Sequence, residues 1–290
     1  MFDPKKFTTT KAKPLPVYLL LDVSTTMGEI IDPENARRTG ETFFRDGKEW
    51  EIVEGGISKM DQLNEAVREM LESFAEAEKM EIEILVSIIT FGDDAYLYLS
   101  PTKASKIKWK NIGADGETAL GASLKMAKAM IEDKETTPSR AYRPLIVLVS
   151  DGQPNDDWEL PLDDFINEGR SSKCHCMAMA IGHDADEEVL NRFIENTPIL
   201  DNKPNKLFYA ENASQINDFF EFVTMTATNT TIKNISKPDS KKIPSKNDKE
   251  VPNASKINLD GATRAEPESN SKGSKQAETT PDDDNNEGYW

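Results

Sequence analysis

The chain has 290 residues, of which 37% are hydrophobic and 30% charged, and its formal net charge is -17 at pH 7. This length suits one large domain or two small ones. The acidic balance repels phosphate backbones, which excludes nucleic-acid binding as the main function, and it is compatible with cations or basic protein surfaces as ligands.

The composition divides the chain into three parts. Residues 1–13 form a polar, basic N-terminal extension without the apolar segment of a secretory signal. Residues 14–227 contain the apolar runs and are expected to fold. Residues 228–290 are rich in Asn, Ser, Lys, Asp, Thr and Pro, which predicts a disordered tail. No apolar run approaches membrane-spanning length, so we expect a cytoplasmic protein that does not bind membranes.

Strand-like and helical patterns alternate along the folded part. In chain order, the predicted elements are a strand at 17–21, a helix at 59–79, a strand at 82–91, an edge strand at 95–99, a helix at 119–133, a strand at 145–149, a helix at 162–170, a strand at 175–181, a helix at 187–195, a strand at 207–209 and a helix at 213–225. The first helix opens with a capping box, Ser58 to Asp61. This order predicts an α/β fold, a Rossmann-like doubly wound and mostly parallel sheet with an antiparallel edge strand and helices on both faces.

Residues 29–56 interrupt the alternation between the first strand and its helix. Within them, Thr42 to Val53 has the pattern of a hairpin closed by Asp46-Gly47. This insertion must project from the face where the strands end. Its aromatic residues either contact a partner or pack back onto the domain, and the sequence leaves both open; they are Phe43, Phe44 and Trp50.

Three loops carry carboxylates and hydroxyls where strands end or helices begin. Asp22, Ser24 and Thr26 follow the first strand, Thr118 ends the loop Gly116-Glu117-Thr118 before a helix, and Asp151 follows the strand 145–149. In a doubly wound sheet these loops belong on one face. A hard cation such as Mg²⁺, or Mn²⁺ or Ca²⁺ in its place, prefers such oxygen ligands and keeps some of its waters.

The three motifs, in this order, resemble the metal-ion-dependent adhesion site of von Willebrand factor A domains, over about residues 14–226. The resemblance implies that three hydroxyls are direct metal ligands, those of Ser24, Thr26 and Thr118. It also implies that Asp22 and Asp151 hold metal waters, and that the open metal position accepts an acidic side chain from a protein partner. Two departures are expected to alter the loop: Thr25 replaces the usual glycine, and Thr26 the usual serine.

Three segments look like those of the bacterial TerY-type group: Pro16 to Asp22, Ile89-Thr90-Phe91-Gly92, and Val149 to Trp158. That resemblance implies a role in tellurium resistance, the stress response or phage defence. It also implies a protein kinase or a PP2C-type phosphatase from the same gene cluster as partner. These are associations, not a mechanism.

An enzyme on a similar sheet is the main alternative, as a phosphatase or phosphotransferase with Asp22 as nucleophile. A haloacid-dehalogenase-like phosphatase would carry a second Asp where Ser24 stands, and neither a dinucleotide-binding glycine motif nor a P-loop is present. No catalytic triad can be assembled from the two histidines. We therefore expect a binding module and not an enzyme. A scaffold that acts through the tail is the third possibility.

Two further clusters have simpler interpretations. Cys174, His175 and Cys176 lie in a predicted strand, where alternation sends His175 away from both sulfurs, so we expect core cysteines and not zinc ligands. Four aspartates are expected to form a solvated acidic face, with the last two opening a helix; they are Asp156, Asp157, Asp163 and Asp164.

Overall fold

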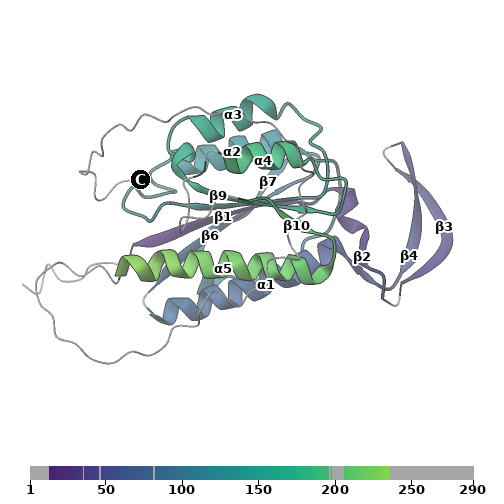
Figure 1. The fold of residues 1–290 in the computed structure, drawn as a ribbon, viewed down its shortest axis with the longest axis horizontal. Helices are drawn as coiled ribbons and strands as arrows, with labels where there is room; N and C mark the ends of the chain where they lie inside the picture. The colour runs from purple at the N-terminus through teal and green to yellow at the C-terminus, as the bar shows by residue number, and fades with distance from the viewer. Residues whose placement is uncertain are drawn as a thin grey trace, which may run out of the picture.

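The structure is a computed structural model that describes residues 13–34, 36–45, 47–80, 82–195, 197 and 206–235. Its centre is a six-stranded sheet in the order β10-β9-β8-β1-β6-β7 (Figure 1). The parallel strands are β1 (Pro14–Asp22), β6 (Glu83–Phe91), β8 (Leu145–Ser150), β9 (His175–Ile181) and β10 (Phe208–Ala210). The edge strand β7 (Ala95–Lys103) runs antiparallel to β6. The predicted fold class is confirmed.

Helices cover both faces of the sheet (Figure 1). One face carries α1 (Lys59–Ala77) and α5 (Ala213–Ile235), and the other carries α2 (Leu120–Glu132), α3 (Glu159–Asn167) and α4 (Glu187–Glu195). In β1, Leu19 and Leu21 point into the core beneath α1 and α5, whereas Tyr18 and Leu20 point into the core beneath the other three helices. Burial on both faces explains why this strand is one continuous apolar run.

The order of the strands places three loops together. β1 lies between β6 and β8, and the chain leaves β1 through α1 on one face but reaches β8 through α2 on the other. The crevice at such a reversal of strand order, at the carboxyl ends of the strands, is where ligands bind in open α/β sheets. The loops after β1 and β8 and the loop before α2 meet there.

The insertion after β1 forms two small antiparallel pairs. At its base β2 (Ile30–Asp32) pairs with β5 (Ile57–Ser58), and beyond them β3 (Arg37–Arg45) pairs with β4 (Lys48–Glu54). Figure 1 shows the β3–β4 hairpin standing away from the body of the domain. The predicted hairpin is confirmed and is longer than expected. Gly47, with a φ of 74°, fits the predicted turn, while Asp46 lies outside the described residues.

The third predicted helix is displaced. We expected it at residues 162–170, but α3 spans Glu159–Asn167. Pro161 lies in the first turn, where backbone N–H groups have no partner inside the helix, so proline is tolerated there. The helix ends before Gly169, which has a φ of 71°. Asp163 and Asp164 therefore lie inside the helix and do not open it.

The last helix is longer than its sequence indicates. α5 continues to Ile235, so residues 228–235, which we assigned to the tail, are helical. Threonine hydroxyls within it donate to carbonyls one turn earlier, as from Thr228 to Thr224 at 2.8 Å. Such bonds satisfy polar side chains that otherwise disfavour helices. Residues 1–12 and 236–290, with most of the predicted extension and tail, lie outside the described residues. No described helix combines the length and apolarity needed to cross a membrane.

Candidate metal centre

Asp22 ends β1 at the centre of the site, with 0% of its surface exposed. One carboxylate oxygen accepts the backbone N–H of Ser24 at 2.8 Å, and the other accepts the Ser150 hydroxyl at 2.6 Å. Burial, followed by the charge of Asp151, raises the pKa of Asp22 to about 7. Without a bound cation, this carboxyl therefore holds a proton over much of the acid range.

Two hydroxyls of the first loop converge on Asp151. The loop after β1 turns into a short 3₁₀ helix, Thr25–Gly28, which brings the hydroxyls of Ser24 and Thr26 to 2.9 Å from each other. Asp151 Oδ1 accepts both, from Thr26 at 2.9 Å and from Ser24 at 3.3 Å. Residues 125 and 127 positions apart in sequence thus form one polar cluster.

Thr118 lies beside this cluster, opposite Gly152. A β-carbon at Gly152 would lie 3.4 Å from the Thr118 hydroxyl and 3.9 Å from that of Thr26. Because glycine has no such atom, both hydroxyls border the space above it. The Thr118 backbone N–H donates to the Asn155 side chain at 3.2 Å, which ties this loop to the one after β8. The structure therefore brings all five predicted residues together where the three loops meet.

Asp156 holds the start of α2. Its two carboxylate oxygens accept the backbone N–H groups of Gly121 at 2.9 Å and Ala122 at 2.8 Å. These are first-turn donors that have no partner inside the helix. We expected Asp156 to belong to a solvated acidic face, and the structure shows instead that it caps the helix that follows Thr118.

Thr25, which departs from the family pattern, joins the first two loops. Its backbone N–H and its hydroxyl both donate to the carbonyl of Gly116, at 2.9 and 3.1 Å. It lies in a 3₁₀ helix, a right-handed conformation that does not require glycine. The substitution adds a hydrogen bond to the loop.

Lys59 is the residue that sequence reasoning missed. Its Nζ donates to Asp151 Oδ2 at 2.8 Å and to Glu29 Oε2 at 2.6 Å. Burial lowers the pKa of Lys59, but the charge of Asp151 and the hydrogen bonds to both carboxylates outweigh it, so the pKa lies above its usual value. Its position could have indicated a special role, because a lysine in the first turn of a helix opposes the helix dipole and needs a compensating partner.

The five predicted residues fit a hard divalent cation. They offer three hydroxyls and two carboxylates, the oxygen donors that Mg²⁺ prefers, around a space that a side chain at residue 152 would fill. Across the described part of the chain, no three or more His, Cys, Asp or Glu side chains group to hold a metal, so a cation here depends on the hydroxyls. Cys174 and Cys176 are buried in the core beneath α2, α3 and α4, as expected.

The hairpin presents aromatic surface away from the domain body. Phe43 and Trp50 face each other across β3 and β4, with ring centroids 6.5 Å apart. Phe44 points elsewhere and is 75% exposed. Phe44 therefore does not pack back onto the domain, which was one of the two interpretations of these aromatics.

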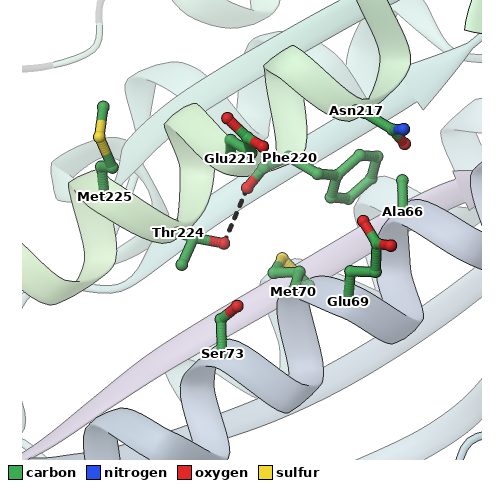
Figure 2. Close-up of a pocket in the computed structure, with 9 residues that line it drawn as sticks. All are labelled: Ala66, Glu69, Met70, Ser73, Asn217, Phe220, Glu221, Thr224 and Met225. Carbon is green, nitrogen blue, oxygen red and sulfur yellow. Dashed lines mark hydrogen bonds between the residues drawn. The ribbon is translucent and has the colours of Figure 1, made fainter. Parts of the chain in front are cut away.

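A separate groove of about 270 Å³ lies between α1 and α5 (Figure 2). Figure 2 shows the ring of Phe220 reaching from α5 toward α1, and a hydrogen bond from the Thr224 hydroxyl to the Phe220 carbonyl. None of the five predicted site residues lines this groove. The oxygen cluster and the groove are therefore distinct features.

Comparisons with known proteins agree with this fold. Residues 17–153 match the family model of the von Willebrand factor type A domain. Similar solved structures include a von Willebrand factor type A protein from Catenulispora acidiphila, at 14% identity and a TM-score of 0.50, which covers 75% of this chain and 43% of that chain. They also include a mutant of the PilB minor pilin from Streptococcus sanguinis, at 16% identity and a TM-score of 0.50, which covers 81% of this chain and 65% of that chain.

At these identities the likeness shows the fold alone, and this chain spans less than two thirds of the length of either structure. No curated protein sequence matches the chain. The described domain has the von Willebrand factor type A fold, and residues 17–153 match the model of that family.

Proposed function

We propose that this domain is a metal-dependent protein-binding module. In this proposal the hydroxyls of Ser24, Thr26 and Thr118 bind Mg²⁺ directly, while Asp22 and Asp151 hold its waters. When bound, the cation supplies a positive charge that attracts an acidic side chain of a protein partner. The chain's own residues position the hydroxyls and exclude competing cations that need soft ligands.

One observation carries the proposal: the hydroxyls of Ser24 and Thr26 both point at Asp151 Oδ1, beside Thr118 and the open space over Gly152. A helix cap would not need two hydroxyls of one loop on a carboxylate of another, with the Thr118 hydroxyl of a third loop beside them. A buried cluster of this kind is instead what an oxygen-liganded cation requires.

The environment of Asp22 argues against its use as a nucleophile. Its side chain is fully buried, and both of its oxygens already accept hydrogen bonds. An attacking carboxylate oxygen must reach a substrate, whereas a carboxylate that orients Ser24 and metal waters can stay buried. Phosphatase activity that disappears in Asp22→Asn would overturn this part of the proposal.

Capture of partners on the immobilised chain, in Mg²⁺ and in EDTA, tests the proposal. We expect specific partners in Mg²⁺ only, and none with Asp22→Asn, since the neutral amide no longer attracts the hydrated cation. Asp157→Asn removes an exposed aspartate of the neighbouring loop and serves as the matched control, with capture unchanged. Thermal unfolding in EDTA shows whether each variant is folded. Capture that ignores both EDTA and Asp22→Asn would contradict the metal mechanism.

The hairpin supplies the second contact in this proposal, because it projects from the end of the sheet where the three loops meet (Figure 1). Phe44→Ser should weaken Mg²⁺-dependent capture without changing stability, as its exposed ring packs on nothing that folding requires. A cytoplasmic kinase or PP2C-type phosphatase of a bacterial stress, tellurite-resistance or phage-defence cluster is the partner that we propose to test first. The family resemblance of β1, of the end of β6 and of the segment from Val149 to Trp158 supports this choice.

A further inference from the structure

Lys59 places a fixed positive charge directly behind the proposed metal site. It is the first residue of α1, and only 9% of its side chain is exposed. Its stem passes Gly182, whose added β-carbon would lie 3.7 Å from both Cε and Nζ. A lysine in this position opposes the dipole at the start of the helix, so its burial must be offset by specific partners.

Those partners are two carboxylates on different loops. The ammonium contacts Asp151 Oδ2 at 2.8 Å and Glu29 Oε2 at 2.6 Å. The other oxygen of Asp151 faces the hydroxyls of Thr26 and Ser24. Asp151 is therefore shared: one oxygen serves the ammonium and the other serves the side where the cation would bind.

This sharing has an electrostatic consequence. A divalent cation on the hydroxyl side and the ammonium on the far side attract the same carboxylate and repel each other. The repulsion is weakly screened because both Lys59 and Asp151 are buried. The ammonium is held between the two carboxylates, and Glu29, which is 40% exposed, offsets part of its charge.

We propose that Lys59 is a resident cation of the site and sets its affinity for divalent metal. It holds Asp151 in the fold before metal binds, and it makes metal binding weaker than the oxygen ligands alone would give. Glu29 opposes this effect by neutralising part of the ammonium charge. The inference rests on the proposed metal-binding function and adds the residues that tune it.

The test is a direct titration with Mn²⁺ as the probe, with free Mn²⁺ measured by electron paramagnetic resonance. We expect Lys59→Met, which keeps the length of the side chain without its charge, to bind Mn²⁺ on the order of tenfold more tightly than the unmodified chain. Lys79→Met is the matched control, because Lys79 is exposed just beyond α1 and, within the described part of the chain, forms an ion pair only with Glu76. It should leave the affinity unchanged.

Glu29→Gln gives a second test that does not depend on a buried substitution. It leaves Lys59 with Asp151 as its remaining carboxylate partner, so we expect Mn²⁺ to bind several-fold more weakly than to the unmodified chain. Circular dichroism in EDTA shows that each variant is folded before titration. If Lys59→Met does not fold, the direction of the Glu29→Gln change decides alone.

The outcomes separate the inference from the function on which it rests. If the unmodified chain binds Mn²⁺ and Lys59→Met binds it with the same or a lower affinity, the inference is overturned and the metal-binding function stands. Binding that appears only in Lys59→Met supports the inference and overturns the function for the natural chain. Absence of binding in both chains overturns both.

Discussion

The two buried aspartates of the metal centre are neutralised in different ways. The Lys59 ammonium lies 2.8 Å from Asp151, whereas Asp22 accepts hydrogen bonds from two neutral donors, the Ser24 N–H and the Ser150 hydroxyl. A carboxylate without a counter-charge in a low-dielectric site favours its protonated form. Burial and the nearby charge of Asp151 accordingly raise the pKa of Asp22 to about 7. A bound divalent cation would favour the ionised form instead.

This raised pKa predicts how stability depends on pH without metal. Between the ordinary value of 3.8 and about 7, folded Asp22 keeps a proton that the unfolded chain has lost, so its contribution to stability falls as pH rises through this interval. In EDTA, the stability of Asp22→Asn relative to the unmodified chain should rise by up to about 1.4 kcal/mol per pH unit there. Urea unfolding at a series of pH values measures this difference.

Comparison of the two chains removes the contribution of the other titrating groups. A stability difference that stays constant from pH 4 to pH 7 would show that Asp22 is ionised in the metal-free fold. Saturating Mg²⁺ provides a further check, because a cation that binds the ionised site should abolish this trend for the unmodified chain.

At the scale of elements, α2 depends on a cap from a different loop. Asp156 accepts the N–H groups of Gly121 and Ala122, and Thr118 lies directly before this helix. We expect Asp156→Ala to lower the free energy of unfolding by about 1 kcal/mol, the usual cost of a lost cap. It should also weaken Mn²⁺ binding, because the Thr118 loop loses its anchor. Urea unfolding and the Mn²⁺ titration measure the two effects.

The neighbouring aspartate gives the control for this prediction. Asp157 is exposed, and the N–H groups at the start of α2 bond to Asp156 instead. Asp157→Ala should therefore change neither the free energy of unfolding nor the Mn²⁺ affinity by a measurable amount. Equal losses in both variants would mean that negative charge near the helix start, and not the two hydrogen bonds of Asp156, stabilises α2.

Caps show which contacts a sequence can reveal. The Ser58–Asp61 capping box was predicted correctly, since its two partners are three residues apart and the pattern is local. The contacts of Asp156 with Gly121 and of Lys59 with Asp151 join residues 35 and 92 positions apart. No local sequence pattern predicts such a contact, because both depend on how the sheet brings distant loops together.

For the whole molecule, the sheet was predictable because each central strand is buried on both faces and reads as one apolar run. The five site residues were placed on one edge by the same argument, since strand ends fix where loops begin. Helix limits were less predictable. The predicted third helix began at residue 162, but Pro161 lies in the first turn of α3. The predicted tail began at residue 228, but threonines there bond to their own helix.

The C-terminal end of α5 leads to a prediction on the domain boundary. Thr231 is 1% exposed, and Ala227 lies in the core beneath α1 and α5, so the last turns of the helix belong to the fold. A chain that ends at residue 235 should unfold at the same temperature as the full chain. A chain that ends at residue 227 should lose on the order of 1 kcal/mol or more, which lowers Tm by about 2–4 °C.

The full chain and the chain that ends at residue 235 also test whether the tail carries the interaction. If the metal centre binds the partner, removal of residues 236–290 leaves Mg²⁺-dependent capture intact, because Thr231 and the core beneath α5 are retained. Loss of capture with an unchanged Tm would instead assign the interaction to the tail. Loss of both would mean that residues beyond Ile235 support the fold, in conflict with the disordered tail that the composition predicts.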